Sequence, residues 1–372
     1  MEPHGRTRES PIASKKGGIM KSFYCLFGIC LSVILCASVA NADVFSMPTG
    51  LTSLEFVPVG DPGNVGELSG TGAGGRGPDR ICGAVDYTYN IGKFEVTAGQ
   101  YTEFLNAVAK TDTYGLYNTE MFTSNHVAGC NIQRTGSAGS YTYTIASDWA
   151  NRPVNFVSWG DSARFANWLN NGQPTGAQDL NTTEDGAYYL NGATSNAALL
   201  AATRKVGAKW VITSEDEWFK AAYYKVGGTN VGYWDYPTGT NNTLSNDLVN
   251  PDPGNNACLY QNGNNTIGSP YYRTEVGEFE NSESPYGTFD QGGNVWEWNE
   301  AIMYSSWRGV RGGGWSANSV NDLHTSIRDS TPPTAEISEI GFRVAEVPEP
   351  ATLTVLALGG VALLRRKSGY GG

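Results

Sequence analysis

The stretch FDQGGNVWEWNEA, residues Phe289–Ala301, places an acidic residue between two tryptophans, shortly after a turn that contains two glycines. The acidic residue is Glu297, and Trp296 and Trp298 flank it. A carboxylate buried among large apolar rings needs a cation, a metal ion or several hydrogen-bond donors. The stretch therefore predicts either a metal site or a structural ion pair at Glu297.

The composition narrows the class of protein. The chain has 372 residues, of which 47 are glycine, 12% are aromatic and only 16% are charged. This favours a compact, loop-rich domain and excludes a helical bundle, a coiled coil or a disordered chain. The net charge is −11, which repels phosphate backbones, so we expect no nucleic-acid partner.

Three segments repeat one design, in which a capping residue precedes an amphipathic helix. The caps are Thr97, Ser158, and either Thr213 or Ser214. Between the helices lie long connections rich in asparagine and glycine, notably residues 170–200 and 227–268. Such loops usually carry function or bind ions. The pattern predicts an α+β domain with few helices, many short strands and much irregular structure.

Six segments, in this order, resemble the formylglycine-generating enzyme (sulfatase-modifying factor) family. They read IGKFEVTAGQYTEFLN, RPVNFVSWGDSARFANWL, WVITSEDEWFKAAY, GGNVWEWNEA, RGGGW and GFRVA. The resemblance implies a variant C-type-lectin-like fold, low in regular secondary structure and stabilised by calcium. It assigns residues 87–347 to the domain and leaves 43–86 as a flexible, glycine-rich lead-in.

The resemblance also implies two calcium sites. Their ligands here would be the side chains of Asp290 and Glu297 with the carbonyls of Gly293 and Val295, and, at the second site, Asn256 with the carbonyl of Ala257. Calcium accepts six to eight hard oxygen ligands, backbone carbonyls included. The alternative for Glu297 is a helix N-cap or an ion pair with an arginine such as Arg311.

The family's catalytic chemistry does not carry over to this sequence. The resemblance implies a copper ion held by two cysteine thiolates, but Ala317 and Asp322 stand at those positions. Copper(I) prefers sulfur ligands, so we expect no copper. Calcium as a structural cofactor is what the resemblance implies. The sequence thus favours a non-catalytic domain with a binding or structural role.

Two hypotheses about ligands remain open at this stage. In the first, the domain binds a glycan or another surface protein, and Tyr233, Trp234 and Tyr236 either stack on a sugar or pack in the core. In the second, the domain is an oxidoreductase or other enzyme with altered chemistry in the same cleft. Its polar cluster would be Asp322, His324 and Arg328.

Both ends of the chain indicate export. Residues 1–42 read as a signal peptide for signal peptidase, with a possible true start at Met20 and an uncleaved anchor as the alternative. Residues 348–367 resemble a PEP-CTERM sorting signal of Gram-negative bacteria, read by exosortase-type machinery. Its apolar run, 351–364, would make a helix of about 21 Å, too short for stable spanning but long enough for transient membrane contact.

We therefore expect the protein in the cell envelope, on the outer surface or in the extracellular matrix. Three cysteines, Cys82, Cys130 and Cys258, would remain after signal cleavage. An exported protein with three cysteines could form one disulfide and keep one free thiol. The sequence leaves the pairing open.

Overall fold

The computed structural model describes residues 45–122, 128–317 and 319–348. The predicted signal peptide and the apolar run 351–364 lie outside these residues. Among the described helices, none combines the length and the apolar character that crossing a membrane requires.

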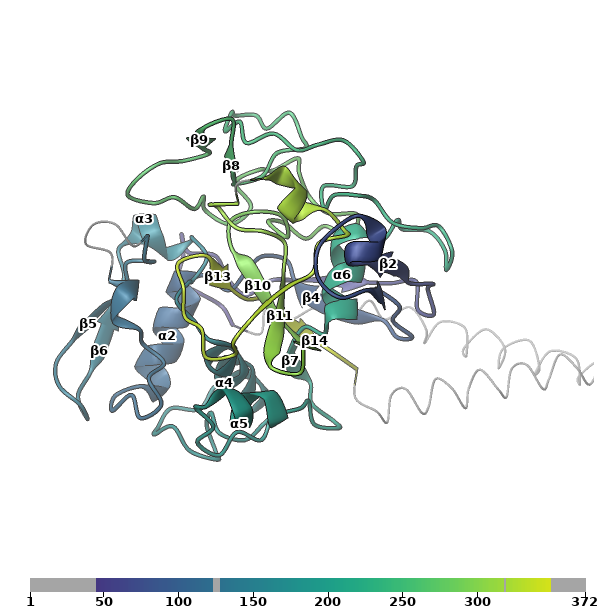
Figure 1. Cartoon of the computed structure of the whole chain (residues 1–372). Coiled ribbons are helices and arrows are strands. Elements are labelled where there is room, and N and C mark those ends of the chain that lie inside the picture. The colour runs from purple at the N-terminus through teal and green to yellow at the C-terminus, as the bar shows by residue number, and fades with distance from the viewer. Residues whose placement is uncertain (1–44, 123–127, 318, 349–372) are drawn as a thin grey trace, which may run out of the picture. The chain divides into compact units, whose positions relative to one another are not determined.

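Two four-stranded sheets form the centre of the domain (Figure 1). The first has the order β1-β4-β14-β7, with strands Phe56–Val59, Tyr89–Gly92, Val344–Glu346 and Trp210–Ile212. The second has the order β12-β11-β10-β13, with strands Asp329–Thr331, Trp307–Arg311, Trp296–Met303 and Ile340–Gly341. All neighbouring strands are antiparallel except β10 and β13, which are parallel.

The last described segment of the chain joins the two sheets. It leaves the second sheet at β13 and enters the first at β14, and only Phe342 and Arg343 lie between the two strands. The ring of Phe342 packs edge-on against Phe165 at 5.4 Å, while Arg343 is fully buried. The GFRVA motif is therefore a short crossing between sheets.

Five α-helices occur in the described part of the chain. They are α2 (Ala98–Val108), α3 (Ser147–Ala150), α4 (Trp159–Asn170), α5 (Asn196–Ala201) and α6 (Glu215–Tyr223). Capping boxes begin α2 at Thr97, α4 at Ser158 and α6 at Ser214, which resolves the choice between Thr213 and Ser214. In each box the cap hydroxyl accepts from a backbone N–H, so one donor that the helix cannot pair is satisfied.

Aromatic packing fixes α2 against α4. Phe104 of α2 contacts Phe165 at 5.3 Å and Trp168 at 5.3 Å. All three side chains belong to the largest hydrophobic cluster, which also contains strands of both sheets. Aromatic pairs at this separation add to the stabilisation from buried area.

From residue 45 onward, the predicted lead-in belongs to the folded domain. Residues 43–86 contain β1, which pairs with β4 along its whole length. They also contain the hairpin of β2 (Glu67–Ser69) and β3 (Arg80–Cys82). The expectation of a flexible segment was wrong, because its short strands pair with residues far away in the sequence or across a glycine-rich turn.

Small elements complete the fold. Two further hairpins pair β5 (Gln133–Thr135) with β6 (Thr142–Thr144) and β8 (Tyr260–Gln261) with β9 (Asn264–Asn265). Single 3-10 turns lie at η2 (Thr71–Ala73), η3 (Thr119–Met121) and η4 (Val320–Leu323). Long loops run from α6 to β10, and in Figure 1 they cover one end of the β10–β11 pair.

Candidate functional site

Glu297 lies in a buried ion pair. Its carboxylate and the guanidinium of Arg343 are both fully buried, with Nε to Oε2 at 2.6 Å and Nη2 to Oε1 at 2.7 Å. The indole Nε1 of Trp218, on α6, also donates to Oε2 at 2.8 Å. The ion-pair alternative is therefore confirmed in kind, but the partner is Arg343 and not Arg311.

Arg311 lies opposite Glu297 in the register of β10 and β11 but pairs elsewhere. Its Nε and Nη2 donate to Oε1 of Glu215, the first residue of α6, at 3.0 and 2.8 Å. Arg328 donates to both oxygens of the same carboxylate at 2.7 Å, and Arg80 lies 3.3 Å away. Sequence reasoning missed this network, because the spacing of these residues shows no motif.

A strained turn sets the direction of the strand that carries Glu297. Asp290, Gly293 and Asn294 all have positive φ, at 59°, 87° and 53°. A Cβ on Gly293 would lie 2.4 Å from the carbonyl oxygen of Cys258, so only glycine fits there. Asn294 donates its backbone N–H to that same oxygen at 2.8 Å. The turn is thus held against the Cys258 segment.

Two further carboxyl groups, those of Glu95 and Asp290, interact electrostatically with Glu297 and Arg343. Burial raises the pKa of Glu95 well above its usual range, the charges of Asp290 and Glu297 raise it further, and Arg343 lowers it. Burial also raises the pKa of Asp290 to about 6. Each of these shifts favours the protonated, uncharged form of the carboxyl group.

The family profile described as "Sulfatase-modifying factor enzyme 1-like domain" matches residues 81–347. The chain belongs to this family. The match includes every segment that carried the resemblance and begins six residues before the predicted boundary at Tyr87. With the observed few helices and many short strands, membership establishes an α+β domain of the variant C-type-lectin-like fold.

Several solved structures have similar folds. CarF is 19% identical, with 80% of this chain and 99% of that chain covered and a TM-score of 0.44. Variable protein 1 of Treponema denticola is 18% identical, with 81% and 98% covered and a TM-score of 0.48. PvdO from Pseudomonas aeruginosa is 18% identical, with 79% and 92% covered and a TM-score of 0.42. No protein of curated function matches the chain significantly.

The residues expected at the first calcium site meet only some of the requirements of a calcium ion. The carboxylate of Glu297 already receives three hydrogen bonds, although its oxygens retain lone pairs for a cation. The carboxyl group of Asp290 would supply hard oxygens of the kind that calcium binds. No three His, Cys, Asp or Glu side chains converge among the described residues, so carbonyls such as those of Gly293 and Val295 would have to complete the shell.

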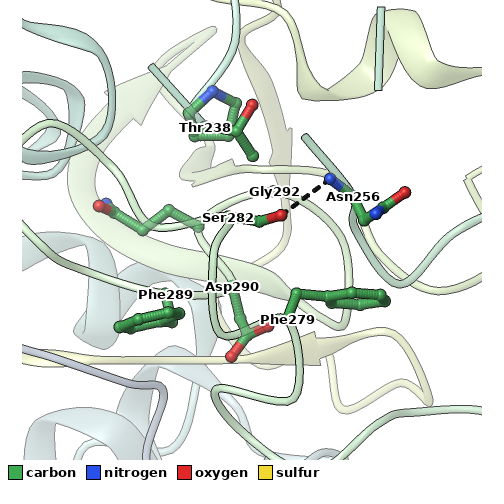
Figure 2. Close-up of a pocket in the computed structure, with 9 residues that line it drawn as sticks. Thr238, Asn256, Phe279, Ser282, Phe289, Asp290 and Gly292 are labelled. Atoms are coloured by element: carbon green, nitrogen blue, oxygen red, sulfur yellow. Dashed lines mark hydrogen bonds between the residues drawn. The ribbon is translucent and has the colours of Figure 1, made fainter. Parts of the chain in front are cut away.

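The residues expected at the second calcium site are engaged with the protein. Nδ2 of Asn256 donates to Asp252 at 2.6 Å, and the carbonyl of Ala257 accepts from the Thr266 hydroxyl at 3.2 Å. Asn256 and Asp290 line one small hollow, where Ser282 accepts from the Asn256 backbone (Figure 2). The hollow offers about 10 Å³, room for about one water molecule. The metal role of all six residues stays a prediction.

The positions of the family's copper-binding cysteines have other contacts here. Ala317 packs in an apolar cluster with Tyr236, Leu244 and Leu323. Asp322 forms an ion pair with Arg76, with Oδ1 to Nη1 at 3.2 Å. An alanine methyl in an apolar cluster and a paired carboxylate do not match the soft thiolate ligands of copper(I).

Each residue of the alternative enzyme's polar cluster has another partner. Asp322 pairs with Arg76 and Arg328 with Glu215, while Nδ1 of His324 contacts the Ser326 hydroxyl at 2.9 Å. The catalytic role of these three residues stays a prediction.

Burial also decides two questions that the sequence left open. Tyr233 and Tyr236 are buried and pack in the core, so they present no face to a sugar. Trp234 is half-buried with Lys225 over its ring, and its contact with a sugar stays a prediction. Cys82, Cys130 and Cys258 are all free and buried, and the disulfide that seemed possible is not formed.

The Glu215 network predicts a defined loss of stability in acid. Burial alone would raise the pKa of Glu215, but Arg311 and Arg328 outweigh it and lower the pKa from 4.5 to about 2. Ionised Glu215 therefore contributes roughly 3 kcal/mol to the free energy of unfolding above pH 4.5, and this is lost as the pH falls towards 2. Glu215→Gln should flatten the pH dependence of stability in that window, measured by urea unfolding.

The matched control is Glu103→Gln, which changes an exposed glutamate on α2. This variant should keep the acid dependence of the wild type. A Glu215→Gln protein with the same pH profile as the wild type between pH 4.5 and 2 would contradict the assignment.

Proposed function

We propose that this protein is an exported, calcium-stabilised, non-catalytic sulfatase-modifying factor-like domain with a binding or structural role in the cell envelope or extracellular matrix. The observation that carries the proposal is the apolar packing of Ala317, together with the pairing of Asp322 to Arg76. A copper-dependent oxidation needs soft ligands at those positions, and neither residue supplies one.

The surface supplies candidate contacts for a glycan or protein ligand. Tyr304 and Trp307, at the turn between β10 and β11, have exposed fractions of 63% and 41%, and their ring centroids lie 5.9 Å apart. Exposed loops on a rigid scaffold are suited to binding. A glycan-array screen of the purified domain separates a sugar ligand from a protein ligand.

Calcium in this proposal has a structural role. The residues that would hold it are Asp290 and Glu297 with the carbonyls of Gly293 and Val295. A bound cation would favour the ionised form of Asp290 and would stabilise the folded state by mass action.

The first prediction is that the domain lacks formylglycine-generating activity. The purified protein is incubated with a CxPxR peptide, copper and a reductant, and the peptide cysteine is followed by mass spectrometry. We expect no conversion, because Ala317 and Asp322 cannot act as thiolate ligands. A family member that keeps both cysteines serves as the positive control, and conversion of the peptide by this protein would refute the proposal.

The second prediction concerns maturation of the two ends. In a host that carries exosortase, mature protein should begin after Ala42 and lack the residues beyond about Pro350, because a 14-residue apolar run is too short for stable anchoring. Mass spectrometry of the envelope fraction measures both ends. An intact C-terminus on envelope-resident protein would count against the sorting signal.

A further inference from the structure

The turn between β10 and β11 has a backbone conformation that its residues do not favour. The backbone N–H of Ser306 donates to the carbonyl of Met303 at 3.1 Å. The two residues between them, Tyr304 and Ser305, have φ of 52° and 59°. Positive φ at both central residues is typical of a type I′ turn, which favours Asn-Gly. In tyrosine and serine the Cβ atom crowds the backbone at these angles, so the turn is strained.

Another hairpin of the same chain has the unstrained solution. Asn262 and Gly263 connect β8 to β9, with φ of 53° and 86°. Asparagine and glycine are the residues that tolerate such angles best. The β10–β11 turn thus departs from the sequence that its conformation favours. Local strain of this kind is concentrated at functional sites, so the side chains that the turn presents need a functional explanation.

The turn presents two aromatic rings to solvent. Tyr304 and Trp307 are both exposed, and their ring planes meet at 79° with the centroids 5.9 Å apart. Among the described residues, neither the Tyr304 hydroxyl nor the Trp307 indole N–H has a hydrogen-bond partner. Each ring therefore offers a ligand both apolar surface and one unused polar group. We call these two side chains the aromatic platform.

The charges around the platform favour an uncharged ligand. Residues 302–307 read IMYSSW and include no charged side chain, while the whole chain has a net charge of −11. An acidic ligand would be repelled by the net charge and would find no cation at the turn. A basic ligand would find no carboxylate there. An uncharged sugar ring fits, because it has an apolar C–H face and hydroxyl groups at its rim.

The area of the platform favours a small ligand over a protein partner. At the exposed fractions of Tyr304 and Trp307, the two side chains offer on the order of 200 Å² together. A stable protein–protein interface buries about 800 Å² on each partner. One or two sugar rings cover the platform, whereas a protein would need contacts far beyond the turn.

We propose that Tyr304 and Trp307 bind an uncharged sugar ring of a polysaccharide. The apolar face of the sugar packs on the rings, and its hydroxyl groups hydrogen-bond to the indole N–H and the phenol oxygen. This inference rests on the binding role in the proposed function and names the site and the class of ligand. Because β10 has eight residues, the platform lies roughly 25 Å from the start of that strand, and it includes none of the expected calcium ligands.

The first test titrates the wild type with dextran, mannan and laminarin, which are uncharged, and with alginate, which is acidic. Binding is followed by tryptophan fluorescence and titration calorimetry. We expect the wild type to bind at least one uncharged polysaccharide. Trp307→Ala and Tyr304→Ala should each weaken that binding at least about tenfold, because aromatic anchors carry most of the energy of a binding site. Tyr189→Ala, which removes an exposed tyrosine elsewhere, is the matched control and should bind as the wild type does.

The second test replaces the turn by Asn-Gly, with Tyr304→Asn and Ser305→Gly in one protein. This double variant should melt at a higher temperature than the wild type, because both new residues tolerate the left-handed angles. It should also bind the polysaccharide at least about tenfold more weakly. A lower melting temperature would mean that the aromatic pair serves to stabilise the hairpin, and the proposal would be overturned.

The other adverse results have separate meanings. If the wild type binds an uncharged polysaccharide and Trp307→Ala binds it equally well, the site is wrong while a glycan ligand stands. If the wild type binds alginate alone, the class of ligand is wrong. If it binds none of the four, the sugar ligand is wrong, while the loss of formylglycine-generating activity in the proposed function is unaffected.

Discussion

The buried pair of Glu297 and Arg343 is the interaction on which the rest of the domain depends. Arg343 lies between β13 of one sheet and β14 of the other, and its guanidinium reaches Gly92 at the end of β4. Glu297 lies on β10 and accepts from Trp218 of α6. One pair of charges therefore connects both sheets and a helix. Removing one member would leave the other charged, buried and unpaired, which is strongly destabilising.

The pairing of Glu297 with Arg343 determines which partners remain for the neighbouring acidic residues. Among the described residues, Asp290 and Glu95 form no ion pair, since the donors of Arg343 bind Glu297 and three backbone carbonyls. Asp290 belongs to the same turn as Gly293, where only glycine fits. Asp322, at a position where the resemblance implied a copper-binding cysteine, pairs with Arg76. The calcium dependence of the scaffold stays a prediction.

The sequence predicted local features well and long-range pairings poorly. The caps at Thr97 and Ser158 follow from contacts within one turn, and the fold followed from six motifs in order. The partner of Glu297 is 46 residues away, and several arginines could equally have reached it. The strands of the lead-in, β1 to β3, were missed because their pairing depends on tertiary contacts. Glu95 is buried without a hydrogen bond to its carboxyl oxygens, and nothing in the sequence around it predicts this.

The most direct measurement is a double-mutant cycle on Glu297 and Arg343, with the free energy of unfolding determined by urea denaturation. Glu297→Gln and Arg343→Met should each cost about 3–5 kcal/mol, because each strands a buried partner. The double variant should cost clearly less than the sum of the two, and Arg343→Lys provides a milder member of the series if a single variant fails to fold. Additive losses within about 0.5 kcal/mol would contradict the central role of this pair.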